Sequence, residues 1–245
     1  MKETIAVWFS CGAASAVAAK KTIEKYGKTH NVIIVNNPVV NEHEDNLRFL
    51  KDCEVWFGRE VISATNSKYP SCDIRDVFEK RKYISGVAGA PCTKELKKEA
   101  RYQFEKNNKI DWHVLGFTVD EKKRSDRFMK FERENVIPIL IDENLTKGNC
   151  FDILIAEKIK LPEIYKLGFP NANCIGCVKS QSPTYWNLVR DKFPDVFEDR
   201  AEQSRRIGAR LVKRKGERIF LDELLPTDKG GKIKSWECGI FCDTE

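Results

Sequence analysis

The fold of this chain is decided near its start, in the stretch Ile5-Ala6-Val7-Trp8-Phe9-Ser10-Cys11-Gly12-Ala13-Ala14-Ser15-Ala16-Val17-Ala18-Ala19. Five apolar residues in a row, at 5–9, are typical of a strand that is covered on both faces. Ser10, Gly12 and Ser15 then indicate a tight turn of small groups and hydroxyls, and 13–21 favours a helix. Such a turn directs backbone N–H groups and the helix dipole at one point, where an anion such as phosphate binds. An ordinary strand-to-helix corner packed with small residues is the alternative.

Length and composition limit the class of protein. The 245 residues suffice for one large domain, or for one domain with a small addition. The chain is 41% hydrophobic and 33% charged, as in soluble globular proteins, and no apolar run approaches the roughly 20 residues that span a bilayer. Because 1–4 leads directly into a strand, we see no signal peptide and expect a cytoplasmic protein without a membrane partner.

The nine cysteines and the net charge of +6 indicate cysteine chemistry and an anionic partner. In a reducing compartment, cysteines serve as ligands or nucleophiles more often than as a disulfide framework. A nucleotide would match the positive charge, and so would a nucleic acid. The sequence leaves the oligomeric state open, with a homo-oligomer among the alternatives.

Strands and helices alternate over the first 142 residues. After the first pair, the expected elements are strand 31–35, helix 45–57, strand 60–65, helix 94–106, strand 112–117 and strand 136–141. This alternation indicates βαβ units and a parallel sheet, with ligands at the carboxyl ends of the strands. We therefore expect an α/β domain at 1–142, a mainly helical, cysteine-containing extension at 143–226 with one strand at 218–221, and a mobile tail at 227–245.

Three further motifs accompany this pattern. They are Asn36-Asn37-Pro38-Val39-Val40-Asn41-Glu42-His43-Glu44, Ala90-Pro91-Cys92-Thr93-Lys94-Glu95-Leu96-Lys97-Lys98 and Gly116-Phe117-Thr118-Val119-Asp120-Glu121-Lys122-Lys123-Arg124. With the first turn, and in this order, they make the chain resemble the phosphoadenylyl-sulfate reductase family of the adenine nucleotide alpha hydrolase (PP-loop) superfamily. Cys174-Ile175-Gly176-Cys177 and Glu237-Cys238-Gly239-Ile240 extend the resemblance over nearly the whole chain.

The resemblance implies a Rossmann-like fold that binds an adenine nucleotide. The residues that it places at the nucleotide are Ser10, Gly12, Ser15, Glu42, His43, Lys94, Lys97, Gly116, Glu121, Arg124 and Arg127. Hydroxyls and backbone N–H groups of the first turn would hold phosphate or sulfate, lysines would add positive charge, and arginines would bind phosphate bidentately. For Glu42 and His43, a helix cap before Asp45 is the alternative.

One departure from the superfamily pattern concerns the first turn. ATP-cleaving members usually read Ser-Gly-Gly-x-Asp-Ser, whereas this chain has Cys11 and Ala14 in place of the second residue and the aspartate. Because that aspartate helps to handle magnesium and pyrophosphate, its absence argues against ATP adenylation and favours sulfonucleotide chemistry. A member that has drifted from both reactions would show the same change.

The cysteines predict a metal centre. Cys174 and Cys177 have the C-x-x-C spacing of metal ligands, and Cys92 at a helix start is expected to have thiolate character. In iron–sulfur members of the family the corresponding cysteines hold a [4Fe–4S] cluster, so the resemblance makes these three residues its ligands. The fourth ligand would come from Cys238 or Cys242, or one iron would keep an open site. A structural zinc and free thiols are the alternatives.

The end of the chain suggests a nucleophile. In the reductases, the cysteine of the terminal Glu-Cys-Gly motif attacks the sulfur of the sulfonucleotide, and a thiol reductant such as thioredoxin then releases sulfite. The resemblance assigns that role to Cys238, although Phe241 stands where the reductases have a histidine. We therefore expect a sulfonucleotide reductase.

Two other functions stay open. The basic stretch 205–215 is either a solvated helix face or a nucleic-acid surface. The nucleic-acid surface would suit an ATP-dependent sulfurtransferase that thiolates DNA or tRNA through the cluster. A nucleotide-binding regulatory module with a structural metal is the third function.

Overall fold

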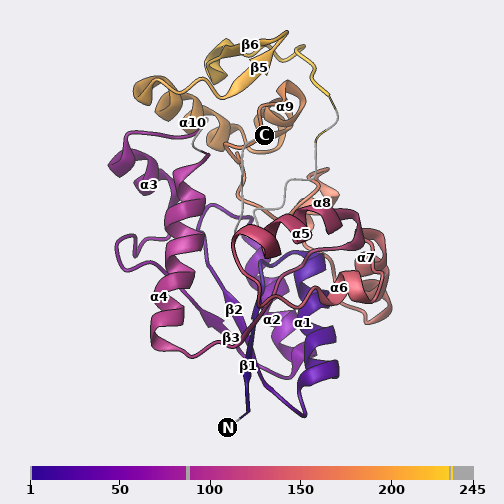
Figure 1. The fold of residues 1–245 in the computed structure, drawn as a ribbon. Coiled ribbons are helices and arrows are strands. Elements are labelled where there is room, and N and C mark those ends of the chain that lie inside the picture. Colours follow the sequence, from indigo (N-terminus) through magenta and orange to yellow (C-terminus); the bar gives the residue numbers. More distant parts are fainter. Residues whose placement is uncertain (1, 87–88, 232, 234–245) are drawn as a thin grey trace. The chain divides into compact units, whose positions relative to one another are not determined.

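The computed structural model describes residues 2–86, 89–231 and 233, and it has the expected α/β architecture (Figure 1). Its strands are β1 (Thr4–Trp8), β2 (Asn31–Asn36), β3 (Val61–Ser63), β4 (Trp112–Val114), β5 (Val212–Arg214) and β6 (Glu217–Ile219). Its α-helices are α1 (Ala13–Tyr26), α2 (Asp45–Phe57), α3 (Ile74–Arg81), α4 (Ala100–Asn107), α5 (Lys122–Phe131), α6 (Ile139–Asp142), α7 (Lys147–Ala156), α8 (Glu163–Lys166), α9 (Pro183–Lys192) and α10 (Pro194–Ile207). A π-helical segment, η1 (Thr93–Glu99), precedes α4, and short 3-10 helices lie at η2 (Val119–Glu121) and η3 (Leu221–Glu223). Within the described ranges, no helix has the length and apolar character that crossing a membrane requires.

Strands β1 to β4 form a parallel sheet in the order β3-β2-β1-β4. Ile5, Ala6 and Val7 of β1 are fully buried, as the apolar run predicts for a strand covered on both faces. The order matches the start of the Rossmann order, in which the chain moves from β1 toward one edge and then returns to the other side of β1. The strand order therefore reverses between β1 and β4, and ligands of such sheets bind at the carboxyl ends beside this point.

Two aromatic residues at the end of β1 show how helices cover the sheet. Successive residues of an extended chain point to opposite faces. Trp8 packs edge-on against Phe104 of α4, with ring centroids 6.1 Å apart. Phe9 packs instead against Phe49 and Phe57 of α2, at 6.1 and 5.6 Å. Helices α4 and α2 therefore lie on opposite faces of the sheet, and α1 packs beside α2 (Figure 1).

The chain divides into two compact units that interleave along the sequence. Unit 1 consists of Met1–Pro38, Glu44–Thr65 and Ala100–Glu163, and unit 2 of Val39–His43, Asn66–Glu99 and Ile164–Glu245. The parallel sheet lies in unit 1. The expected boundary after residue 142 falls inside unit 1, where α7 packs against α1. Three separate parts of the chain build unit 2, an arrangement that a division by sequence position does not anticipate.

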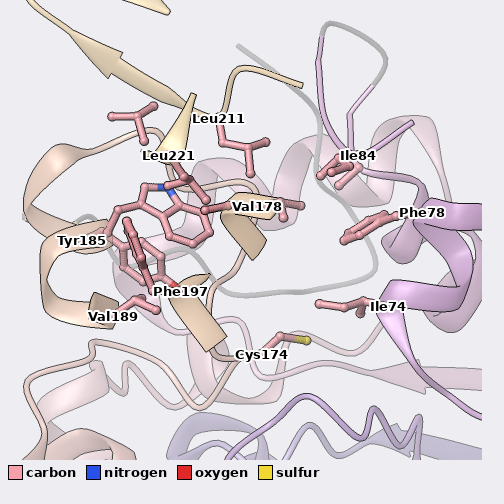
Figure 2. Packing of buried hydrophobic residues seen from close by; sticks show 14 of the residues in the cluster. Ile74, Phe78, Ile84, Cys174, Val178, Tyr185, Val189, Phe197, Leu211 and Leu221 are labelled. Atoms are coloured by element: carbon pink, nitrogen blue, oxygen red, sulfur yellow. The ribbon is translucent and has the colours of Figure 1, made fainter. Parts of the chain in front are cut away.

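Unit 2 has its own hydrophobic core (Figure 2). Ile74 and Phe78 of α3 pack there with apolar side chains of α9, α10 and η3. Cys174 belongs to this core, and Cys92 and Cys177 pack against it. Cys92 thus shares one core with Cys174 and Cys177, which follow it about eighty residues later in the sequence.

The expected strand 136–141 is not a strand, and this prediction is wrong. Val136 forms only an isolated parallel bridge with His113, and the Ile137 N–H donates to the His113 carbonyl at 2.9 Å. Pro138 has no N–H to continue the ladder, and α6 begins directly after it at Ile139. In the described part of the chain the sheet therefore ends at β4 on this side.

The other expected elements are present with shifted ends. Helix 45–57 is α2, the strands expected at 60–65 and 112–117 are shorter, and the expected helix 94–106 begins with the π-helical segment η1. The late strand is β6, and its antiparallel partner β5 was not expected. Lys215 and Gly216 connect the two with φ of +48° and +95°, as a tight hairpin turn requires. Most of the tail expected to be mobile lies outside the described residues.

Candidate functional site

The turn between β1 and α1 is held closed by its own hydroxyl groups. The Ser15 hydroxyl accepts from the Ser10 N–H at 3.1 Å and donates to the Gly12 carbonyl at 2.9 Å. The Ser10 hydroxyl lies 3.1 Å from the same oxygen. Cys11 adopts a left-handed conformation with φ of +54°, which turns the chain sharply toward α1. The structure thus brings the predicted residues Ser10, Gly12 and Ser15 together in one compact turn.

The start of α1 presents backbone N–H groups at this turn. Gly12 is the N-cap in an extended conformation, and its position carries no side-chain cap. The first N–H groups of an α-helix have no partner within the helix, and the helix dipole places partial positive charge there. A phosphate or sulfate group at this end would accept hydrogen bonds from such N–H groups.

Gly116, which follows β4, allows a second segment to reach the turn. A Cβ atom at this position would lie 2.8 Å from the Ser15 nitrogen, 3.0 Å from the Ser15 Cα and 3.1 Å from the Ala14 carbonyl carbon. All three are backbone atoms, which cannot rotate away from a side chain. Glycine is therefore the residue that fits where the end of β4 meets the start of α1.

Asn36, at the end of β2, also supports the β1–α1 turn, although the sequence motifs did not predict it as a site residue. Its side-chain amide donates to the Phe9 carbonyl at 2.7 Å and lies 3.7 Å from the Cys11 sulfur. The neighbouring Asn37 donates instead to the Ala64 carbonyl at 2.9 Å. Two amide side chains directly after an apolar strand are the signal that could identify it, because a buried amide needs hydrogen-bond partners.

Arg124 of α5 lies over the Phe117 ring, with its guanidinium carbon 5.2 Å from the ring centroid. Its Nη1 donates to Glu121 Oε1 at 2.5 Å. Because Phe117 follows Gly116, Arg124 and Glu121 are tied to the segment that approaches the first turn. Arg127 lies exposed on the same helix.

The other four residues predicted to bind the nucleotide belong to unit 2. The Lys97 ammonium lies 3.3 Å from the Glu42 carboxylate, and these side chains are only 9% and 10% exposed. The His43 ring packs edge-on against Phe193 at 5.8 Å, and Lys94 is exposed. Burying a charge is costly unless an opposite charge is paired with it. In this structure Glu42 and Lys97 have that relationship.

Asn41 connects the segment 39–43 to the Cys174–Cys177 loop. Its carbonyl accepts the Ile175 N–H at 2.9 Å. Its side chain accepts the Ile74 N–H at 2.9 Å and donates to Asp73 at 3.0 Å. These bonds fix the loop between the two cysteines against the start of α3.

Cys174 and Cys177 line a small cavity of about 30 Å³ within unit 2, together with Tyr185. The Tyr185 hydroxyl accepts the Cys177 N–H at 2.7 Å. Burial raises the pKa of Tyr185 well above its usual value, and negative charge at Cys177 acts in the same direction. The phenol therefore keeps its proton at neutral pH and remains a hydrogen-bond donor.

Arg200 of α10 carries a buried positive charge in the same unit. It is 1% exposed, its Nη1 donates to Gln203, and its guanidinium carbon lies 5.1 Å from the centroid of the Phe78 ring. Its Nε has no hydrogen-bond partner among the residues that the structure describes. A buried guanidinium with an unused donor is costly unless negative charge lies nearby.

The negative charge that acts on Arg200 comes from Asp199 and from two of the predicted cysteines. Burial lowers the pKa of Arg200, whereas negative charge at Asp199, Cys92 and Cys174 raises it. The Asp199 carboxylate is bound by Arg75 at 2.7 Å. The guanidinium of Arg200 would therefore stabilise thiolates at Cys92 and Cys174.

These residues fit a [4Fe–4S] cluster in part. In the described portions of the chain, no three His, Cys, Asp or Glu side chains stand close enough to hold a single metal ion. The proposed further ligands Cys238 and Cys242 lie outside those portions. Two thiols on one cavity and the unused Nε of Arg200 suit a thiolate-bound cluster, which carries net negative charge.

No protein-family model matches the chain, and no curated protein matches it. Among solved structures, the chain is similar to U34-tRNA thiolase NcsA from Methanococcus maripaludis with its [4Fe-4S] cluster. The alignment has a TM-score of 0.47 and 12% sequence identity, and it covers 84% of this chain and 69% of that chain.

Proposed function

We propose that this protein is an enzyme that binds an adenine nucleotide at the β1–α1 turn and performs sulfur chemistry with the cysteines of unit 2. One observation carries the nucleotide site. The strand order reverses between β1 and β4, and Gly116 lies against Ser15 beside this point. Rossmann-like sheets bind nucleotides at the carboxyl ends of the strands where the order reverses.

The turn has the donors that a phosphate group needs. The N–H groups at the start of α1 would donate hydrogen bonds to phosphate oxygens, and the hydroxyls of Ser10 and Ser15 would hold the turn that presents these groups. Arg124, held by Glu121 and Phe117, would add a charge-assisted contact. The nucleotide would be bound without help from an aspartate at the position of Ala14.

Cys92, Cys174 and Cys177 would hold the [4Fe–4S] cluster, which when bound supplies iron that can hold or pass on sulfur. Arg200 would balance the negative charge of the thiolates, and Gln203 would keep the guanidinium in place. The Tyr185 hydroxyl would order the loop of Cys177 through the hydrogen bond that it accepts. A fourth thiolate from Cys238 or Cys242, or an open iron site, would complete the set.

Two reactions are compatible with this proposal. In the first, an oxygen of a nucleic-acid base attacks the α-phosphorus of ATP and releases pyrophosphate, and hydrosulfide then displaces AMP from the base. The positive charge of unit 2 favours this reaction, because it would attract the negatively charged backbone of a nucleic acid. Residues of unit 2 account for most of the net charge of +6. The sulfur donor would be a thiol or sulfide delivered to the cysteine site.

In the second reaction, the Cys238 thiolate attacks the sulfur of an adenine sulfonucleotide. The bond from sulfur to the phosphate oxygen breaks, and the nucleotide leaves with its electron pair. A thiol reductant such as thioredoxin then attacks the Cys238 sulfur, so that sulfite leaves and a mixed disulfide forms. The alanine at position 14 favours this reaction over ATP adenylation.

Substrate tests with anaerobically purified protein separate these reactions. The substrates are adenylyl sulfate, its 3′-phosphorylated form, and ATP with RNA or DNA and a sulfide donor. Sulfite release that Cys238→Ser abolishes and Cys242→Ser reduces only mildly indicates the reductase. Thionucleoside formation that Cys174→Ser abolishes, together with iron binding, indicates sulfur transfer. Nucleotide binding without turnover of any substrate contradicts both reactions and indicates a regulatory module.

A further inference from the structure

Unit 2 contains an open pocket that is lined by none of the residues predicted to bind the nucleotide or the metal. It has a volume of about 300 Å³ and lies between the segment after α3, the end of α10 and strand β6. The polar side chains that line it are Lys82, Tyr83, Ser85, Arg210 and Arg218. It shares no lining residue with the cavity of Cys174 and Cys177.

Two arginines of this pocket differ in their ion pairing from the other arginines around it. Arg205, Arg206 and Arg214 each bind a carboxylate, at 2.6, 2.8 and 3.2 Å. Arg210 and Arg218 have no carboxylate within ion-pair distance in the described part of the chain. Arg218 donates to the Arg210 carbonyl at 3.4 Å, and Arg210 lies over a phenylalanine ring. Their positive charges are therefore available to a ligand.

The β5–β6 hairpin concentrates further charge on the same face. Lys213 pairs directly with Arg218 in the antiparallel register, so the two side chains project from one face. Like charges directly opposite each other destabilise a strand pair. An anion bound at Arg218 would remove this repulsion.

Lys82 adds a third positive charge to the pocket itself. Its ammonium lies 3.8 Å from the Glu79 carboxylate. That carboxylate is already bound by both Nη atoms of Arg206 at 2.8 Å and by the Gln203 amide at 2.8 Å. Because Arg206 already compensates the negative charge of Glu79, Lys82 adds net positive charge to the pocket.

The pocket also has neutral donors. The Tyr83 hydroxyl lies 2.6 Å from where a Cβ atom of Gly86 would be, so glycine at this position leaves room for the phenol. Ser85 supplies a second hydroxyl. Guanidinium groups bind phosphate oxygens bidentately, and hydroxyls complete such sites with single hydrogen bonds.

We propose that this pocket binds a phosphate group, supplied by a nucleic-acid backbone or by a free nucleotide. The proposal does not depend on the sulfur chemistry, because it rests on Lys82, Arg210 and Arg218 alone. It concerns a site separate from the β1–α1 turn, which lies in unit 1. A protein with both sites would bind two phosphate-containing groups at once.

The test measures binding of two probes to the full-length protein. A fluorescein-labelled, single-stranded RNA of 12 nucleotides is titrated by anisotropy, and ATP by calorimetry. The variants are Arg210→Gln and Arg218→Gln, with Arg75→Gln as the control. Arg75 belongs to the same unit and is half-exposed in an ion pair with Asp199, so its loss changes the net charge equally.

For a nucleic-acid ligand, each pocket variant weakens RNA binding about tenfold and lowers the slope of log K against log salt by about 1, while ATP binding is unchanged. For a free nucleotide, the pocket variants bind one ATP fewer per chain than the unaltered protein does, and RNA binding is unchanged. Either result supports the phosphate site if Arg75→Gln behaves like the unaltered protein. The proposal is overturned if the pocket variants bind both probes as tightly as the unaltered protein does. It is also overturned if Arg75→Gln loses as much binding as the pocket variants lose. Circular dichroism and urea unfolding confirm that each variant is folded.

Discussion

A Cβ atom on Gly116 would lie 2.8 Å from the backbone nitrogen of Ser15. The two residues are about a hundred positions apart in the chain, and they meet where the strand order reverses between β1 and β4. The contact fixes the distance between the end of β4 and the start of α1. It therefore sets the geometry of the proposed nucleotide site before any ligand binds.

Gly116→Ala tests this contact. The added methyl group forces backbone atoms apart, so we expect a loss of stability of about 1–3 kcal/mol and weaker nucleotide binding. Urea unfolding and calorimetry with ATP measure the two effects. Gly148→Ala is the control, because a Cβ atom there would meet only the Thr146 hydroxyl, at 3.6 Å. If Gly116→Ala kept full stability and affinity, the proposed steric role would be wrong.

Asn36→Ala tests whether this side chain, at the end of β2, supports the β1–α1 turn. The variant loses the hydrogen bond to the Phe9 carbonyl, and we expect a loss of stability of about 1–2 kcal/mol together with weaker nucleotide binding. Asn37→Ala is the matched control. It loses a hydrogen bond of similar length to Ala64, so it should lose similar stability but keep its nucleotide affinity. Equal affinity losses in the two variants would contradict a specific role for Asn36.

Arg124→Ala tests the charged contact to the nucleotide. Removing a charge-assisted bidentate contact should weaken nucleotide binding by roughly 1.5–3 kcal/mol. Calorimetry with ATP and with adenylyl sulfate measures the change. Lys122→Ala on the same helix removes an exposed cation that pairs with Asp126, and it should have little effect. Unchanged affinity in Arg124→Ala would exclude this residue from the site.

Arg200→Met tests the proposed counter-charge of the cysteine site. In the protein without iron, replacing a buried cation by an apolar side chain should leave stability equal or increase it. After anaerobic reconstitution, the variant should hold less iron and should have a more negative reduction potential, because a positive charge near the cluster stabilises its reduced state. Iron analysis and a redox titration followed by visible absorption measure these effects.

Arg205→Met on the same helix is the control for Arg200, since Arg205 is exposed and paired with Asp222. An unaltered protein that takes up no iron would contradict the proposed cluster. Normal iron content and potential in Arg200→Met would contradict only the role of Arg200.

His113 should make the protein sensitive to acid. Burial, together with the charges of Arg133 and Arg101, lowers the pKa of His113 to about 3 from its usual 6.5. Its ring nitrogens face the Trp8 indole N–H at 3.1 Å and an Arg133 guanidinium nitrogen at 2.6 Å, and a protonated ring would direct N–H groups at both donors. The folded state therefore favours the neutral ring. The resulting stability is complete above pH 6.5 and is lost as the pH falls toward 3.

Urea unfolding between pH 7.5 and pH 4.5 measures this dependence. His113→Gln should be less stable at pH 7.5 and should lose less stability on acidification than the unaltered protein. His30→Gln, which replaces a histidine near the surface beside Glu3, should keep the original pH dependence. An unchanged slope in His113→Gln would assign the acid sensitivity to other groups.

Local patterns in the sequence determine much of the fold. An apolar run followed by small residues and hydroxyls specifies β1, the turn and α1, because strand propensity, turn chemistry and helix propensity act between near neighbours. Ser10, Gly12, Ser15 and Gly116 could be selected from such motifs. The prediction of a strand at 136–141 is wrong because Pro138 lacks the N–H that would continue the strand, although the run is apolar.

What the tertiary structure alone decided is which distant residues meet. The division of the nucleotide-site residues between two units, the support of the turn by Asn36 and the pairing of Glu42 with Lys97 are visible only there. The same holds for the buried charge of Arg200 near Cys92 and Cys174, and for Arg210 and Arg218, which line one pocket and pair with no carboxylate among the described residues. Sequence patterns report residue type and local periodicity. Hydrogen bonds, steric fit and the cost of a buried charge depend instead on groups that the packed sheet and core bring within a few ångströms of one another.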